Sequence, residues 1–477
     1  MKKSRTTALL LLTAILLSAC GQSAGDGTGT TPVDEISSGG GVTETSEPDI
    51  YADLPTGDYG GEEFNIFNTT MNWANSTLDL DSMTGDVLDD AMYQRTRDTE
   101  AKLGVKIKVT EMEIWGGAPN HVKSVIMAGD GSYDAIYMCA LEAAPMMSEN
   151  LFLDLYDVEE LNFDKPWWDT RTRKYYEIDG KLFMAHGDAQ INYYEGLWSI
   201  YFNKQFIDDL SLESPYDLVE SGKWTMDAMK SQMSAATKDL DGNGTMDKSD
   251  RFGYISHDGS ALAFLHGCDE RGIEIVNGRY AFNNLDDRMF DVITAIQNNI
   301  FTNKEEVLRV DDKTLFVSGH SLFYGEVLGN AKVLRGMDAD FGIIPFPKYD
   351  EAQENYISYI SPGSVALLLP VSLTDEQLSR SATVMENFNA LSYETVLPAY
   401  YDITLSGKSL RDEESTEMLN IMFENCDCEL SYVYGFAGYK DTLTSVMTKG
   451  GAVTSTLEGK KAAVEEKINA LYEAISK

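Results

Sequence analysis

Strands and helices alternate along residues 62–138, and this alternation constrains the fold more than any other feature of the sequence. Three short apolar runs have the length and alternation of strands, at 63–67, 105–111 and 133–138. Between them, residues 86–103 and 121–127 carry apolar side chains on one helical face, and Gly104 follows the first of these helices as a C-cap would. The β-α-β-α-β order predicts an α/β sheet with helices on both faces. The same alternation resumes after residue 200.

The length and charge of the chain limit its domain organisation and its partners. A chain of 477 residues is too long for a single hydrophobic core, so two domains are expected. The formal net charge of −39 argues against nucleic-acid binding, because no basic stripe offsets the repulsion from phosphates. It also argues against a body that lies flat on anionic lipid. Net charge does not identify a small-molecule ligand.

The cysteines are few and do not have the spacing of a zinc site. Apart from Cys20, the chain contains Cys139, Cys268, Cys426 and Cys428. The hydrophobic core, not disulfides, should therefore hold the fold together. A bridge from Cys268 to the Cys426–Cys428 pair and a set of free buried thiols are both compatible with the sequence.

The N-terminus has the pattern of a secretory leader. Cationic residues at 2, 3 and 5 precede the apolar run 8–17, which is too short to span a bilayer. The stretch Leu17-Ser18-Ala19-Cys20 resembles a bacterial lipobox, which implies cleavage of the signal peptide 1–19 and acylation of Cys20, for example with palmitate. An ordinary signal peptide with a chance cysteine is the alternative. Residues 20–49 are polar and rich in Gly, Ser and Thr, so they are expected to form a disordered tether. The predicted location is the extracellular face of the cell membrane, with a lipid anchor.

Residues 239–250 match the calcium-loop pattern D-x-[DN]-x-[DN]-G. The expected oxygen ligands come from Asp239, Asp241, Asn243, the Thr245 carbonyl, Asp247 and Asp250. Gly244 permits the sharp turn, although Asp250 stands where an EF-hand has Glu and the loop is single, unlike the pair in a dockerin. A polar turn without a metal is the alternative. The pattern predicts a structural Ca²⁺ between a helix at 225–236 and a strand at 252–255.

Several short motifs occur in a fixed order along the chain. They are Pro166-Trp167-Trp168-Asp169, Gly180-Lys181-Leu182-Phe183, Tyr201-Phe202-Asn203-Lys204, Trp224-Thr225, the run DFGIIPFPKY at 340–349, and a segment from Tyr400 to Leu419. Together they resemble bacterial extracellular solute-binding proteins of family 1, the maltose-binding type of ABC importers, and in particular their Gram-positive subgroup. The resemblance covers residues 60–440.

The resemblance implies a two-lobe periplasmic-binding-protein-like fold of type II, in which a hinge joins two α/β lobes and the ligand lies in the cleft. Lobe one should comprise 50–200 and 363–398, and lobe two 203–360 and 399–477. Ligands of open α/β folds lie at the carboxyl ends of strands, and hinge closure is a population shift towards the ligand-bound form. The implied function is capture of an extracellular saccharide, in particular an oligosaccharide, by a monomer that delivers it to the transmembrane subunits of an ABC permease.

Candidate cleft residues combine aromatic rings with carboxylates and amides. Sugar rings stack on flat aromatic side chains, and their hydroxyls bond to carboxylates and amides. The candidates are Asn72, Trp73, Trp115, Asp188, Asn192, Glu195, Trp198, Tyr324, Glu326, Tyr432 and Tyr434. Glu195 lies one residue away from the position where the resemblance places a sugar-binding acid. Trp167 and Trp168 are assigned to the core of lobe one.

No catalytic motif is evident, and the sequence predicts that the protein is not an enzyme. The five histidines have no HExxH spacing, and neither Gly-x-Ser-x-Gly nor a P-loop occurs. Paired carboxylates carry little weight in a chain with 77 acidic residues. The alternatives are a glycoside hydrolase, a surface glycan-adhesion lipoprotein, and the same importer role with a peptide cargo.

Overall fold

The structure, a computed structural model, describes residues 49–129, 131–283, 285–334, 336–406 and 412–476. Residues Leu54–Lys477 form one unit that contains the helices and strands of the described chain. The predicted leader, Cys20 and all of the predicted tether except Asp49 lie outside the described residues.

The first sheet has four strands in the order β14-β3-β1-β2. These strands are β1 (Glu62–Thr70), β2 (Val105–Glu113), β3 (Ala135–Cys139) and β14 (Val365–Leu368). β1 pairs in parallel with β2 and β3, whereas β14 runs antiparallel to β3. The carboxyl ends of β1, β2 and β3 therefore lie at one edge of the sheet.

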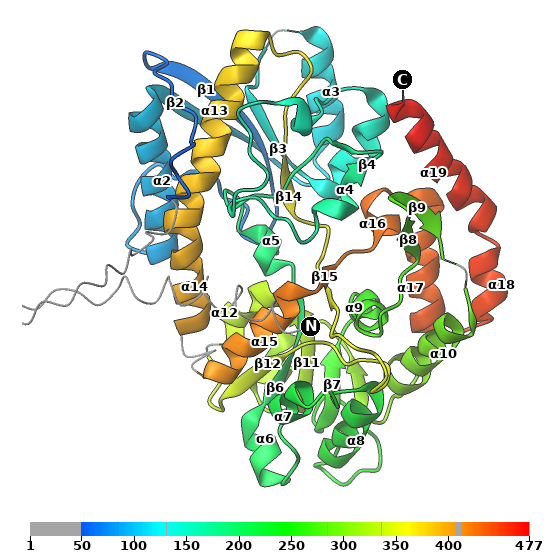
Figure 1. The fold of residues 1–477 in the computed structure, drawn as a ribbon. Coiled ribbons are helices and arrows are strands. Elements are labelled where there is room, and N and C mark those ends of the chain that lie inside the picture. Colours follow the sequence, from blue (N-terminus) through cyan, green and yellow to red (C-terminus); the bar gives the residue numbers. More distant parts are fainter. Residues whose placement is uncertain (1–48, 130, 284, 335, 407–411, 477) are drawn as a thin grey trace, which may run out of the picture. The chain divides into compact units, whose positions relative to one another are not determined.

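Helices α2 (Val87–Leu103) and α3 (Ala118–Ala128) connect these strands, which confirms the predicted β-α-β-α-β order. The carboxylate of Asp86 accepts the N–H groups of Leu88 and Asp89 at the start of α2, and Gly104 ends it in the left-handed conformation with φ 63°. Helix α13 (Asp375–Leu391) packs beside α2 (Figure 1) and continues through a π-helical turn (Ser392–Val396) into α14 (Leu397–Ser406).

A buried carboxylate organises the core next to the first sheet. Glu386 of α13 accepts the Nε1–H of Trp167 at 2.9 Å and that of Trp168 at 2.8 Å. Both rings are almost fully buried, which confirms their predicted place in the core. Satisfying both indole donors removes the cost of burying them.

The second sheet has five strands in the order β10-β7-β11-β6-β12. They are β6 (Trp198–Asn203), β7 (Phe252–Ser256), β10 (Val307–Arg309), β11 (Ser321–Val327) and β12 (Phe341–Ile344). β10, β7 and β11 are parallel, and β6 runs antiparallel to both β11 and β12. The predicted helix at 225–236 is α8 (Met226–Ala236), and the predicted strand at 252–255 is β7.

A narrow ribbon of backbone pairing runs between the two sheets. Leu197 forms a bridge with Ile360, and β13 (Ser358–Tyr359) pairs in parallel with β15 (Cys426–Asp427). We refer to these segments as the connecting ribbon. β6 crosses the predicted lobe boundary at 200–203 and belongs as a whole to the second sheet. The division of the chain into two lobes at the predicted residues stays a prediction.

The remaining elements are shorter and surround the two sheets. The helices are α4 (Ala140–Ala143), α5 (Asn192–Glu195), α6 (Lys204–Asp209), α7 (Pro215–Glu220), α9 (Ser260–Gly267), α10 (Asp287–Ile296), α11 (Lys313–Val317), α12 (Ala331–Leu334), α15 (Glu413–Glu424), α16 (Leu430–Val433), α17 (Tyr439–Lys449), α18 (Val453–Glu458) and α19 (Lys461–Ile475). The other strands are β4 (Glu177–Ile178), β5 (Lys181–Leu182), β8 (Ile273–Val276) and β9 (Arg279–Phe282).

Two smaller features of the described chain complete the fold. Cys139, Cys268, Cys426 and Cys428 are all free and buried, so the second of the two cysteine alternatives holds. Within the described ranges, no helix has both the length and the apolar character needed to cross a membrane.

Candidate functional site

Two exposed tryptophans lie at adjacent strand ends of the first sheet. Trp73 follows β1 and Trp115 follows β2, and their exposed fractions are 47% and 66%. Asn72 beside Trp73 is also exposed. Tryptophan side chains are buried on average, so two exposed rings at one sheet edge make this edge a candidate ligand surface.

Glu142 lies next to Trp115 and was not among the predicted site residues. It belongs to α4, directly after β3, and its Oε1 accepts the backbone N–H of Trp115 at 3.1 Å. Its Oε2 is buried and has no hydrogen-bond partner among the described residues. Burial raises the pKa of Glu142. The signal in the sequence is an acid placed directly after a buried strand of the sheet.

Further contacts gather side chains around the same edge. Leu141 Cδ1 and Trp73 Nε1 lie 3.8 and 3.9 Å from the position that a Cβ of Gly363 would occupy. Helix α16, which contains the half-buried Tyr432, packs against α4. The edge therefore combines Trp73, Trp115 and Glu142 with a nearby tyrosine from the C-terminal part of the chain.

The carboxyl edge of the second sheet carries a histidine and two carboxylates. His257 follows β7, Asp311 follows β10, and Glu326 lies at the end of β11. One ligand atom from each lies within 4.8 Å of the others, which is a spacing that a metal ion could bridge. His257 Nδ1 accepts the N–H of Gly259 at 3.1 Å, so Nε2 carries the proton of the neutral ring and donates to Glu326 at 3.1 Å. These hydrogen bonds favour a His257–Glu326 pair over a metal centre.

Glu195, one of the predicted site residues, connects the two edges. Its Oε2 accepts the N–H of Asn75, in the loop after β1, at 2.5 Å. Its Oε1 lies 3.6 Å from Nζ of Lys332 in α12, which follows β11. Glu195 itself is buried, and burial raises its pKa. The carboxyl ends of the two sheets therefore meet at this residue.

Trp198 lies at the second edge but is largely covered. It begins β6, and its ring centroid is 5.5 Å from that of His257 and 6.3 Å from that of Phe346. Only 6% of the residue is exposed. The ring therefore supports His257, and only a small part of it is open to a ligand.

Two predicted cleft residues, Tyr324 and Tyr434, are parts of the core instead. Tyr324 stacks between Tyr201 and Phe316 in the second sheet. Tyr434 stacks on Phe436, and its hydroxyl lies 3.1 Å from that of Tyr280. Burial leaves neither ring a free face for a sugar.

Asp188 and Asn192 are buried in the segment before β6. Asp188 Oδ1 accepts the hydroxyl of Tyr194 at 2.5 Å, and burial raises the pKa of Asp188 to about 7. Asn192 Oδ1 accepts the N–H of Val365 at 2.9 Å, which ties this segment to β14. Both side chains therefore position the chain near Glu195 and do not face an open surface.

The loop at 239–250 brings three of its predicted metal ligands together. One carboxylate oxygen from each of Asp239, Asp241 and Asp250 lies within 4.8 Å of the others. Asp250 is buried, and its two oxygens accept the N–H groups of Leu240 and Asp247, each at 2.8 Å. A cluster of hard oxygen donors fits Ca²⁺ by its chemistry.

The other three predicted ligands are arranged differently. Asp247 is outside this cluster, and its Oδ1 accepts the N–H of Ser249 at 2.8 Å. Asn243 Oδ1 accepts the N–H of Thr245 at 2.7 Å. Gly244 has φ 79°, which confirms the predicted need for glycine in this turn.

Comparisons with known proteins identify the fold. No family model matches the chain, and no curated protein matches its sequence. Among solved structures, an ABC substrate-binding protein from Listeria monocytogenes in complex with cycloalternan is 11% identical and has a TM-score of 0.54. The match covers 86% of this chain and 99% of that protein.

Two further solved structures are similar to the same extent. A maltose/maltodextrin-binding domain from Bdellovibrio bacteriovorus bound to maltotriose is 14% identical, with a TM-score of 0.54 over 85% of this chain and 100% of that chain. A sugar transporter from Rhizobium etli in an open conformation is 13% identical, with a TM-score of 0.56 over 84% of this chain and 99% of that chain. These matches confirm the predicted two-lobe α/β fold.

Proposed function

We propose that the protein captures an extracellular saccharide, in particular an oligosaccharide, and delivers it to the transmembrane subunits of an ABC permease. The observation that carries this proposal is the pair of exposed rings, Trp73 and Trp115, beside the buried and half-satisfied carboxylate of Glu142. The saccharides named in the structures of similar fold, cycloalternan and maltotriose, support the ligand class.

The chemistry of this edge suits a sugar. The C–H faces of a pyranose stack on indole rings, and each such contact also removes apolar surface from water. A sugar hydroxyl that donates to Glu142 Oε2 would satisfy an oxygen that lacks a partner among the described residues. One oligosaccharide could therefore use both rings and the carboxylate together.

The carboxyl edge of the second sheet supplies polar groups that could contact the ligand in the closed form. The His257–Glu326 pair and Asp311 offer a proton donor and several acceptors. Rotation about the connecting ribbon would add these contacts to those of the first edge, which stabilises the closed state relative to the open one. The Glu195–Asn75 hydrogen bond and the Glu195–Lys332 ion pair lie where the two sheet edges approach each other.

We infer that capture occurs without turnover. The proteins of similar fold bind their ligands, and the acids at the two edges serve as hydrogen-bond acceptors in this proposal. A panel of glycans tested by calorimetry and by product chromatography distinguishes the alternatives. New products would indicate a glycoside hydrolase. Binding of peptides in place of glycans would support the importer role with a peptide, and not a saccharide, as the ligand.

We also propose that Cys20 is acylated and holds the protein at the extracellular face of the membrane. The support is the leader pattern in the sequence, including the small residues at 18 and 19. An anchored, monomeric binding protein would remain close to its permease. A glycan-adhesion lipoprotein would share the anchor but would not stimulate uptake through a permease, so uptake assays separate the two.

We propose that the loop at 239–250 binds a structural Ca²⁺. The clustered carboxylates of Asp239, Asp241 and Asp250 support this proposal, since a bound cation would offset their mutual repulsion. The ion would fix the connection between α8 and β7, away from both sheet edges described above.

A further inference from the structure

The segments that form the carboxyl edge of the first sheet contain no lysine, arginine or histidine. They are residues 71–76 after β1, 111–118 at the end of β2, 140–143 in α4, and 361–364 before β14. Their acidic residues are the buried Glu142 and the exposed Glu111 and Glu113. This edge therefore combines two exposed indole rings with carboxylates and has no cation of its own.

Glu142 is buried without a positive partner in the described chain. The residue is 6% exposed, and its Oε2 has no hydrogen-bond partner there. Burial raises the pKa of Glu142, and the backbone hydrogen bond from Trp115 is the opposing influence. Because a carboxylate removed from water is costly without a counter-charge, a cation supplied by a ligand would stabilise it.

The same carboxylate holds the backbone of Trp115. Trp115 has φ 64°, a left-handed conformation that bulky residues rarely adopt, and its N–H donates to Glu142 Oε1 at 3.1 Å. A rare conformation of this kind persists where the surrounding structure holds it in place. The exposed indole and the uncompensated carboxylate are therefore kept next to each other.

Cations on elements near this edge already face other carboxylates. Lys332 Nζ lies 3.6 Å from Glu195 Oε1. Lys440 Nζ lies 3.4 Å from Asp441 Oδ1 and 4.4 Å from the centroid of the Tyr432 ring. Neither lysine therefore supplies a free positive charge to the edge.

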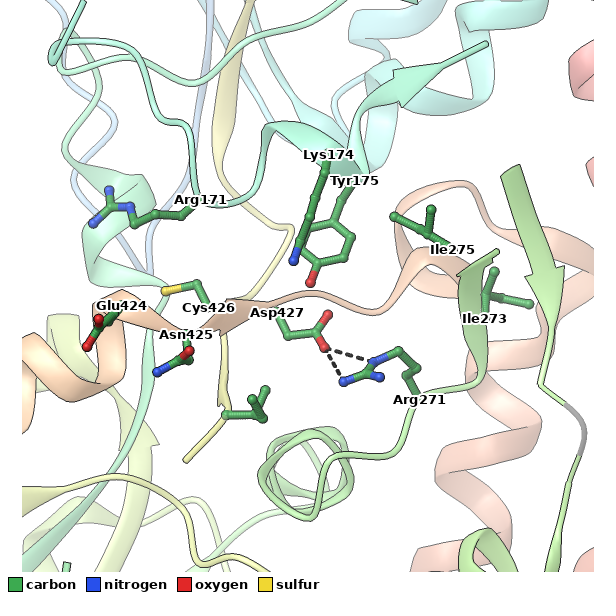
Figure 2. A pocket seen from close by; sticks show the side chains of 11 residues that line it. Arg171, Lys174, Tyr175, Arg271, Ile273, Ile275, Glu424, Asn425, Cys426 and Asp427 are labelled. Atoms are coloured by element: carbon green, nitrogen blue, oxygen red, sulfur yellow. Dashed lines mark hydrogen bonds and ion pairs between the residues drawn. The ribbon is translucent and has the colours of Figure 1, made fainter. Parts of the chain in front are cut away.

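Three further cations gather at a separate cavity of about 460 Å³ beside the connecting ribbon. They are Arg171, Lys174 and Arg271, and Figure 2 shows Lys174 and Arg271 on either side of Asp427. None of the segments of the first edge lines this cavity. These cations therefore balance carboxylates elsewhere.

A protonated amine suits the first edge better than a hydroxyl or an acid does. An ammonium group is attracted to the face of an indole ring, and tryptophan is the best aromatic partner for it. Its hydrogen bonds to a carboxylate are charge-assisted and about twice as strong as neutral ones. A hydroxyl would leave the charge of Glu142 uncompensated, and the carboxylate of a uronic acid would place a like charge beside it.

We propose that the saccharide bound at this edge is an amino sugar, an oligosaccharide that carries at least one free, protonated amine. The ammonium group lies against the indole of Trp115 on the side of Glu142, and a neighbouring sugar ring stacks on Trp73. Glu142 thereby determines the selectivity for charge. This selectivity rests on the proposed function, because it concerns the same saccharide site.

Calorimetry with matched sugars tests the selectivity on the mature protein. Glucosamine oligomers are compared with the corresponding glucose, N-acetylglucosamine and glucuronate oligomers, and the galactose series is offered in the same four forms. At a pH at which the amine is protonated, we expect an amino sugar to bind about tenfold more tightly than its neutral and N-acetylated counterparts. The uronates should not bind saturably. Raising the pH until the amine is neutral should remove the preference, since Glu142 remains ionised.

Glu142→Gln removes the charge and keeps an acceptor for the N–H of Trp115. This variant should bind the amino sugar about tenfold more weakly and the neutral counterpart within about threefold of the wild type. Glu466→Gln is the matched control, because Glu466 is exposed on α19 and forms no ion pair with a described residue. It removes the same charge and should leave both affinities unchanged. The comparison of sugars on the wild type does not depend on the folding of either variant.

The outcomes separate the selectivity from the proposed function. Neutral or N-acetylated saccharides that bind as tightly as their amino counterparts would overturn the selectivity and leave saccharide capture intact. An unchanged preference in Glu142→Gln would also overturn it, as would a lysine-rich peptide that binds where no amino sugar does. If no saccharide of any form binds, the proposed function fails as well.

Discussion

Replacing His266 with glutamine should destabilise the protein strongly, because this imidazole is enclosed by two carboxylates. His266 lies in α9 and is fully buried, with Nδ1 3.5 Å from Asp427 Oδ2 and Nε2 3.4 Å from Glu429 Oε2. Tyr359 covers the ring, with centroids 4.9 Å apart. Burial alone would lower the pKa of His266, but the two carboxylates together raise it. When it is protonated, the ring therefore ties α9 to the connecting ribbon and to the segment that follows it.

The expected loss of stability in His266→Gln depends on the hydrogen-bond donors that Asp427 and Glu429 retain. Breaking a buried ion pair costs about 3–5 kcal/mol, because the remaining charge is uncompensated. Here Asp427 keeps Arg271 at 2.8 Å, and Glu429 keeps the N–H groups of Gly272 and Ser431 at 2.8 and 3.0 Å. Since both carboxylates retain donors and the His266 contacts are long, we expect the low end, about 3 kcal/mol.

The contribution of His266 to stability should decrease as the pH rises. A histidine whose pKa is raised by folding contributes its full stability below its unfolded pKa, about 6.5. That contribution is lost as the pH rises through the raised folded value. The difference in unfolding free energy between wild type and His266→Gln should therefore shrink towards alkaline pH.

Urea unfolding at several pH values measures this difference. His320→Gln is the control, because His320 is not buried and, among the described residues, its side chain hydrogen-bonds to Ser318 Oγ, at 3.0 Å, and forms no ion pair. It should change the stability by less than about 0.5 kcal/mol. A loss below about 1 kcal/mol for His266→Gln, or a loss that does not vary with pH, would refute the reasoning from buried charge.

Three further predictions concern the proposed sites. Trp115→Ala should weaken saccharide binding by about 1–3 kcal/mol in calorimetry. Met127→Ala is the control, because Met127 on α3 is similarly exposed, and it should leave the affinity unchanged. If wild type and Trp115→Ala bind the saccharide with equal affinity, Trp115 does not stack on it. Chelation should lower the melting temperature, and Asp241→Ala should abolish that response; a wild type insensitive to chelator would show that the loop is only a turn. Cys20→Ala should release the protein from the membrane fraction and eliminate fatty-acid labelling, and labelling equal to wild type would exclude acylation at this residue.

Local signals in the sequence predicted the first sheet and its connections well. Asp86 and Gly104 lie at the ends of α2 because capping depends on a few neighbouring residues. The exposed positions of Trp73 and Trp115 also followed from the sequence, since each ring comes directly after a strand whose end could be located.

Tertiary packing determined the parts that the sequence did not predict. Tyr324 was expected at the cleft because β11 ends nearby, but the side chain faces Tyr201 of the adjacent strand, and strand pairing of this kind is non-local. His257 and Glu142 were missed as site residues. Their importance depends on partners far away in the sequence, Glu326 and Trp115.

Direct measurement of saccharide binding to the mature protein tests the central claim. An oligosaccharide panel should contain at least one ligand that binds saturably, shifts tryptophan fluorescence and makes the protein more compact in solution scattering, because closure brings the two sheet edges together. The double variant Trp73→Ala, Trp115→Ala should lose this binding while it keeps the melting temperature of the wild type, since both rings are exposed. Wild-type affinity in this double variant, or a panel in which no saccharide binds, would contradict the proposal that this sheet edge is a saccharide site.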